Sequence, residues 1–186
     1  MSDEARGATC GRAGNEPHWL SAREMRTWLA FWGAMHLVDA AIDRDLQERS
    51  GLSHGAYQIL AMLAAAPAQR LRMSTLAEVV FVSRSRLTYQ VTQLEKAGLV
   101  QREEYAGDKR GAVAALTTRG LETLREAAPG HVACVRRVFF DVLTPQQVGV
   151  LGDALTAVRD RLLGGTERGI ITELLASLTP SGQDEA

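Results

Sequence analysis

The sequence predicts a mainly helical fold that carries one small β-hairpin, and three observations support this prediction. Only 5% of the residues are aromatic although 46% are hydrophobic, because alanine and leucine, which favour helices, dominate the apolar set. Apolar residues recur at three- and four-residue spacing along most of the chain, between residues that typically begin or end helices. The stretch after Gly98 departs from this spacing, with two strand-like segments around a turn-rich one.

The composition is that of an ordinary globular protein, with 186 residues, 23% charged residues and a formal net charge of −1. Binding to nucleic acid would therefore require positive charge gathered on one face. Cys10 and Cys134 lie far apart without metal-ligand spacing, which favours a reduced, cytoplasmic protein with no disulfide framework. The longest apolar run, residues 59–68, is too short to cross a membrane, and the N-terminus lacks the apolar stretch of a signal peptide.

The first helix is expected from residue 18 to about residue 49, after a glycine-rich tail over residues 1–16. Trp28, Trp32 and Met35 recur at helical spacing in a segment that is unusually apolar for a helix covering a small core. Such a surface normally meets a partner. We therefore expect an interface here, with an ordinary core helix as the alternative.

Three shorter helices follow, and a serine is the predicted N-cap of each. The last of them has a clear apolar stripe of Leu87, Val91 and Leu94, spaced so that they share one face. The opposite face is polar and is formed by Ser85, Arg86, Tyr89, Thr92 and Lys96. The three predicted helices are residues 55–65 after Ser53, residues 74–80 with Ser74 as the cap, and residues 84–97 after Ser83.

A β-hairpin is predicted next, with strands over residues 99–105 and 112–116 and a charged, turn-rich tip over residues 106–111. Thr117 or Thr118 is the expected cap of the following helix. Local rules predict that Pro129-Gly130 breaks or sharply kinks that helix. Thr144-Pro145 begins a last long helix, which is expected to end at Gly164-Gly165. A short helix around residues 170–178 is one alternative for the C-terminal part.

This order of elements is the layout of a winged helix-turn-helix, in which a helix with a narrow polar face enters the major groove of DNA. Local charge agrees, because residues 70–92 contain four arginines and one glutamate, a net charge of +3. The alternative is that these arginines only form a solvated surface. The predicted DNA-binding residues are Ser74, Thr75, Ser83, Arg84, Ser85, Arg86, Thr88, Tyr89, Thr92, Asp108, Lys109 and Arg110.

About three-quarters of the chain, residues 28–163, resembles the MarR family of winged helix-turn-helix transcriptional regulators. The segments that carry the resemblance are Leu76-Ala77-Glu78, Ser83 to Thr88, Leu94 to Val100, Asp108 to Gly111, and Leu116 to Gly120.

The resemblance implies a homodimer that binds a pseudo-palindromic site on double-stranded DNA. It assigns residues 17–50 and 119–165 to a helical dimerisation base and residues 51–118 to the DNA-binding domain, followed by an extension over residues 166–186. It also implies that the helix through Pro129 is continuous but kinked. Arg110 would enter the minor groove, with Asp108 steadying it. Tyr89 stands where many relatives carry arginine, so the preferred base is not carried over.

Family members commonly act as repressors that a small aromatic or phenolic effector releases from DNA. Trp28, Trp32 and His36 share one helical face and could line such a site, although a dimer core with a hydrogen-bonded histidine is the simpler interpretation. The alternative functions are a thiol-based redox sensor and a protein-interaction module. Cys134 lies among valines and is expected to be packed and unreactive. The scattered histidines suggest no metal site, and no cofactor or catalytic motif is present, so an enzyme is not expected.

Overall fold

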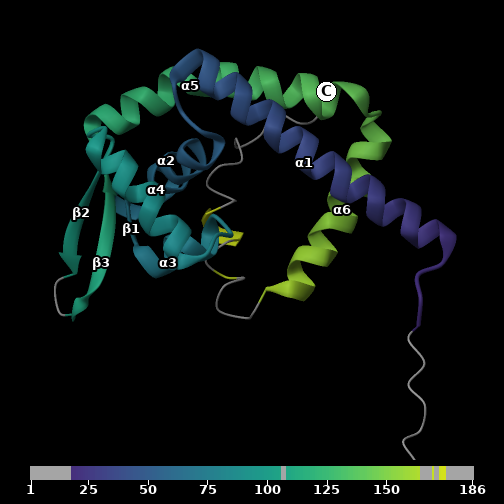
Figure 1. Ribbon diagram of the computed structural model, residues 1–186, viewed down its shortest axis with the longest axis horizontal. Coiled ribbons are helices and arrows are strands. Elements are labelled where there is room, and N and C mark those ends of the chain that lie inside the picture. The colour runs from purple at the N-terminus through teal and green to yellow at the C-terminus, as the bar shows by residue number, and fades with distance from the viewer. Residues whose placement is uncertain (1–17, 106–107, 164–168, 170–171, 175–186) are drawn as a thin grey trace, which may run out of the picture. The chain divides into compact units, whose positions relative to one another are not determined.

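The computed structural model describes residues 18–105, 108–163, 169 and 172–174. The chain divides into two compact units, residues 1–35 and residues 36–186. The described part of the first unit consists mostly of the N-terminal part of helix α1 (Ala22–Ser50), which continues into the second unit (Figure 1). The long helix predicted from residue 18 is thus confirmed, although it begins four residues later.

The second unit contains the remaining helices and all the strands assigned within the described residues. Figure 1 shows the β-hairpin beside α2, α3 and α4. The elements are α2 (His54–Ala65), a 3-10 turn (Pro67–Gln69), β1 (Arg70–Arg72), α3 (Met73–Val79), α4 (Arg84–Lys96), β2 (Val100–Tyr105), β3 (Asp108–Leu116), α5 (Thr118–Val138), a second 3-10 turn (Phe140–Val142) and α6 (Pro145–Leu162).

The core of this unit forms where α2, α3 and α4 pack against one another and against the sheet. Ile59, Leu60 and Leu63 of α2 are fully buried, as is Leu76 of α3. Ile59, Leu60 and Leu63 are spaced so that their side chains lie on one face of α2. Burial of this apolar surface is the main contribution to the stability of this unit.

The sheet has three antiparallel strands in the order β1-β3-β2, of which β1 is not among the strands predicted from the sequence. Arg70 pairs with Ala115 and Val100 pairs with Leu116, so β3 is the central strand. Strand β3 begins at Asp108, opposite Tyr105, and most of the predicted turn over residues 106–111 is therefore strand. Pairing with β2 outweighs the weak strand propensity of Asp108, Lys109 and Gly111.

Side-chain caps begin five of the described helices, including α1, where Ser21 Oγ accepts from the Glu24 N–H at 3.3 Å. Ser53, Ser83 and Thr117 each accept a hydrogen bond from the backbone N–H three residues later, at 3.1, 3.3 and 2.9 Å. Thr117, rather than Thr118, is therefore the cap of α5. Thr144 and Gln147 form a reciprocal capping box at the start of α6. The prediction for Ser74 is wrong, because β1 runs directly into α3, which begins at Met73 without a side-chain cap.

Helix α5 is continuous through Pro129, so the break predicted from local rules is wrong and the continuity implied by the family resemblance is confirmed. Proline removes one backbone donor, but buried residues on both sides of it, Leu124, Ala127 and Cys134, hold the helix against the core. Gly120, in the first turn, lies so close to the Leu99 carbonyl oxygen that a Cβ would collide with it. The glycine of the Leu116 to Gly120 segment therefore has a packing role.

The last helix, α6, has no buried residue and ends at Leu162, two residues before the predicted Gly164-Gly165. Residues 169 and 172–174 are helical and Leu174 is buried, whereas the rest of the helix proposed for residues 170–178 lies outside the described residues. None of the helices among the residues that the structure describes is long and apolar enough to cross a membrane.

Candidate nucleic-acid interface

Helix α4 presents a polar face to solvent because its apolar stripe is anchored in the core. Leu87, Val91 and Leu94 are at most 4% exposed, which confirms the stripe predicted from spacing. The exposed side chains at the other side include Arg84, Ser85, Arg86, Thr88, Tyr89 and Lys96. An anchored helix with a narrow polar face has the form that the major groove admits. The contacts of these residues with DNA stay a prediction.

The N-terminal end of α4 combines unpaired backbone amides with two exposed arginines. Ser83 Oγ caps the helix and lies 3.2 Å from Ser85 Oγ. Over the described ranges, neither Arg84 nor Arg86 has an ion pair. Positive charge and free amides at a helix N-terminus both favour an anion such as phosphate.

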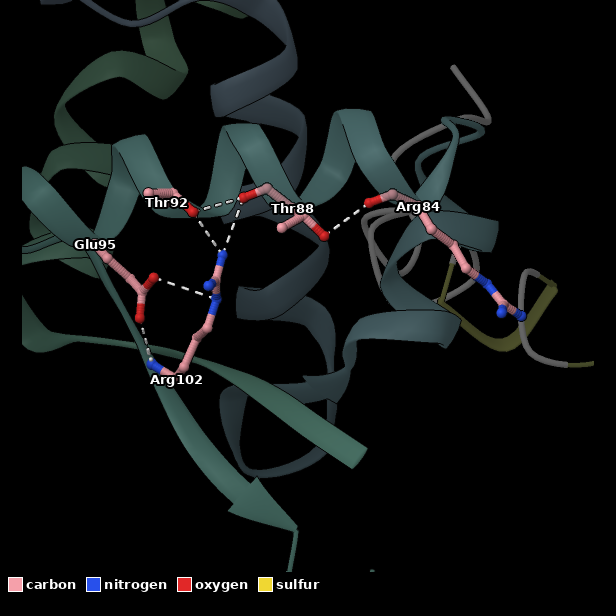
Figure 2. A network of polar contacts seen from close by, with 5 residues as sticks. All are labelled: Arg84, Thr88, Thr92, Glu95 and Arg102. Atoms are coloured by element: carbon pink, nitrogen blue, oxygen red, sulfur yellow. Dashed lines mark hydrogen bonds and ion pairs between the residues drawn. The ribbon is translucent and has the colours of Figure 1, made fainter. Parts of the chain in front are cut away.

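Arg102, which sequence analysis did not single out, connects strand β2 to helix α4 (Figure 2). Its Nη2 donates to the Thr88 carbonyl oxygen at 3.0 Å and to Thr92 Oγ1 at 2.8 Å. Its Nε lies 3.2 Å from Glu95 Oε2, and its backbone N–H donates to Glu95 Oε1 at 3.1 Å. The strand is therefore attached to two successive turns of the helix.

The two threonines of α4 differ in what they can offer a ligand. Thr88 Oγ1 donates to the Arg84 carbonyl oxygen at 2.8 Å, and its exposed side chain keeps free acceptor capacity. Thr92 Oγ1 donates to the Thr88 carbonyl oxygen at 2.8 Å and also accepts from Arg102. Thr92 is half-buried, and its hydroxyl is engaged within the protein. The geometry therefore favours Thr88 over Thr92 as a residue that could contact a bound ligand.

The remaining predicted DNA-binding residues lie on α3 and on β3. Ser74 is exposed and Thr75 is half-buried on α3, which packs against α4. Asp108, Lys109 and Arg110 are the first residues of β3, and their side chains lie outside the described part. The structure thus confirms a β-hairpin here, and the role of its tip stays a prediction.

Two histidines that appear scattered in the sequence lie close together in the fold. The rings of His54 and His131 are 5.8 Å apart, and Tyr57 lies 4.1 Å from His131. His54 Nδ1 is 2.7 Å from Asp39 Oδ1. Burial, with the charge of His54 adding to it, lowers the pKa of His131. Within the described ranges, no three His, Cys, Asp or Glu side chains are arranged to hold a metal ion.

Cys134 is only 1% exposed, which confirms the packed thiol expected from its apolar neighbours. Burial, with the negative charge of Asp45 adding to it, raises the pKa of this thiol. A raised pKa keeps the thiol protonated and poorly nucleophilic, which argues against a redox role for Cys134. Cys10 lies outside the described residues. In the first helix, Trp28 and Trp32 are each 53% exposed.

The capped and anchored helix, the adjoining α3 and the β-hairpin define a winged helix-turn-helix protein. The model of the MarR family matches residues 50–111. The structure is similar to that of Sco3205, a MarR family transcriptional regulator from Streptomyces coelicolor solved in complex with DNA, with 43% identity and a TM-score of 0.77 over 82% of this chain and 96% of that one.

A second regulator from Streptomyces coelicolor, AbsC, is 41% identical with a TM-score of 0.72 over 77% of this chain and 97% of its own. The HTH-type transcriptional repressor YetL of Bacillus subtilis (strain 168) is 33% identical over 106 residues, which is 55% of this chain and 64% of YetL. The chain thus spans slightly less than two thirds of that curated relative. This chain belongs to the MarR family of transcriptional regulators.

Proposed function

We propose that this protein is a sequence-specific DNA-binding regulator that acts as a homodimer on a pseudo-palindromic site, where it represses transcription. The observation that carries the proposal is the exposed polar face of α4, fixed by a buried stripe and bearing Arg84 and Arg86 at its N-terminal end. The solved DNA complex of Sco3205 supports DNA binding, and the similarity to the transcriptional repressor YetL supports repression.

In this proposal α4 enters the major groove and the wing meets the adjoining minor groove. Ser85, Arg86 and Tyr89 would read base edges, while Arg84, Ser74 and Thr75 would contact the backbone. At the wing, Arg110 would enter the minor groove, where arginine is favoured by the negative potential, with Lys109 and Asp108 beside it.

The homodimer is supported by apolar surface outside the DNA-binding domain. In the first unit, Trp19 is 80% exposed and Leu29 is 56% exposed. Helix α6 has no buried residue and borders an apolar hollow of about 500 Å³ lined by Leu143, Val150 and Leu151, among others. Such surfaces in a protein of this family are expected to meet a second copy, as required for two half-sites.

The first test is selection of duplexes from a randomised pool, followed by fluorescence anisotropy on the enriched duplex and a scrambled one. We expect a pseudo-palindrome bound about 10³-fold more tightly than scrambled DNA, with strong salt dependence between about 50 and 200 mM. Arg86→Ala should change which sequences are enriched. Arg125→Ala is the matched control, because it removes an exposed arginine on α5. Absence of any enriched sequence would contradict sequence-specific binding.

The proposal also includes a small-molecule effector. Trp28, Trp32 and His36 would bind a small aromatic or phenolic molecule that releases the protein from DNA; the half-exposed tryptophans support this. Titration of the protein–DNA complex with phenol and with benzoate tests it. We expect release by one of them in the wild type and weaker release in Trp28→Ala. No release at about 10 mM of either compound, far above useful affinity, would contradict this assignment.

A further inference from the structure

We propose that Arg102 is a positioning residue: it fixes helix α4 on the wing strand β2 and thereby sets how well the protein distinguishes its own DNA site from other DNA. This inference rests on the proposed function. Arg102 would contact the nucleic acid neither at a base nor at a phosphate.

The guanidinium of Arg102 is already engaged by the protein. It contacts Thr88, Thr92 and Glu95 (Figure 2). Its side chain is 31% exposed. Arginine suits this position because its planar fork can satisfy several acceptors at fixed angles. A lysine would keep the charge but would lose the geometry.

The contacts fall where a shift of the helix would affect recognition directly. The Thr88 carbonyl oxygen accepts from Arg102, and the exposed Thr88 side chain belongs to the predicted reading face of α4. The apolar stripe holds α4 on the core at the opposite face. Arg102 supplies the lateral attachment, because apolar packing alone leaves a helix freer to slide and rotate than directional hydrogen bonds do.

Arg102 also neutralises Glu95, a carboxylate on α4 whose side chain is 29% exposed. Removal of Arg102 would therefore leave an uncompensated negative charge as well as a loosened helix. The double variant Arg102→Ala with Glu95→Gln separates the two effects, since it removes the attachment without leaving the charge.

The test compares the affinity of each variant for the duplex that the wild type selects with its affinity for scrambled DNA. For Arg102→Ala, for the double variant and for Arg102→Lys, we expect affinity for the selected duplex to fall about tenfold or more. In the double variant and in Arg102→Lys, which leave no uncompensated charge on residue 95, affinity for scrambled DNA and the salt slope should stay within about twofold of wild type, because no phosphate contact is lost.

Arg70→Ala is the matched control. Arg70 lies on β1 and its Nη1 is 3.1 Å from Glu103 Oε2, so this variant removes an arginine and an ion pair from the same sheet without a described contact to α4. Its ratio of selected to scrambled affinity should equal that of the wild type. Thermal unfolding checks that each variant is folded, and Arg102→Lys carries the test if the alanine variant does not fold.

An unchanged affinity ratio in a folded Arg102 variant would overturn the positioning role. A salt slope reduced by about one phosphate contact would also overturn it, because Arg102 would then bind the DNA backbone. If the wild type itself shows no preferred duplex, the proposed function fails first, and this result is distinguishable from failure of the positioning role.

Discussion

The winged-helix lobe of residues 52–116 and the segment of residues 18–35 place most of their large apolar side chains in opposite environments, Phe81 of the lobe being an exception at 63% exposed. In the lobe, Leu60 and Leu63 are fully buried and the exposed face of α4 is polar. In the segment, Trp19 and Trp28 are 80% and 53% exposed. The difference shows that the lobe buries an apolar core of its own, and the exposed segment agrees with the proposal that it meets a second copy.

The largest expected effect comes from removing part of the lobe core. Leu60→Ala should lower the free energy of unfolding by about 2–5 kcal/mol, because the lost apolar burial is not recovered when a cavity remains. Urea denaturation followed by circular dichroism measures it. Tyr89→Ala, in the same lobe but 67% exposed, should change stability by less than about 0.5 kcal/mol. Similar changes in the free energy of unfolding for the two substitutions would contradict the difference between buried and exposed positions.

Next in size is a charge placed in the apolar segment. Trp28→Glu should weaken the proposed homodimer by about 2–4 kcal/mol, because it places a charge in the apolar surface proposed as the interface, while the lobe stays folded. Sedimentation velocity across a dilution series measures the monomer–dimer equilibrium. Gln93→Glu adds the same charge at an exposed position of α4 and should leave the monomer–dimer equilibrium unchanged. A Trp28→Glu protein that dimerises like the wild type would argue against an interface here.

A smaller effect is expected where the lobe meets α5. Thr117 Oγ1 accepts from the Gly120 N–H at 2.9 Å and donates to the Gly98 carbonyl oxygen at 2.8 Å. Thr117→Ala should therefore cost about 1–2 kcal/mol of stability in urea denaturation. Thr118→Ala is the control, because this neighbouring residue is exposed and does not cap the helix. Equal losses from both would exclude the capping role.

The smallest effect concerns pH. Burial, aided by the charge of His54, lowers the pKa of His131 below its ordinary value of 6.5, so the unfolded chain binds more protons just below that pH. Stability should therefore be complete above about pH 6.5 and fall as the pH drops below it. His131→Gln should flatten this dependence in thermal unfolding between about pH 7.5 and 5.5. The exposed His18 provides the control: His18→Gln should retain the wild-type slope.

Local patterns predicted the elements whose stability is decided locally. The spacing of Leu87, Val91 and Leu94 identified the buried face of α4, and Ser83 identified where that helix begins. Both signals act within one or two helical turns. The break predicted at Pro129 is absent, because tertiary packing around this residue outweighs the lost hydrogen bond.

Contacts between distant residues could not be predicted from one sequence. Strand β1 has three residues, with a half-buried Leu71 between two exposed arginines, and it is a strand only because β3 pairs with it. Likewise, nothing in the spacing of Arg102 and Glu95, or of His54 and His131, indicates that each pair meets in space.

The pairing of β1 with β3 also has a consequence for the order of folding. β2 and β3 are neighbours in the chain, whereas Arg70 and Ala115 are separated by about 45 residues. Closing the longer loop between β1 and β3 costs more chain entropy, so the β2-β3 hairpin is expected to form first. Strand β1 is expected to pair with β3 after α3 and α4 have formed between them. A newly made chain would thus form its β2-β3 hairpin before its three-stranded sheet. The edge of β3 that pairs with β1 would be the last to gain its hydrogen bonds.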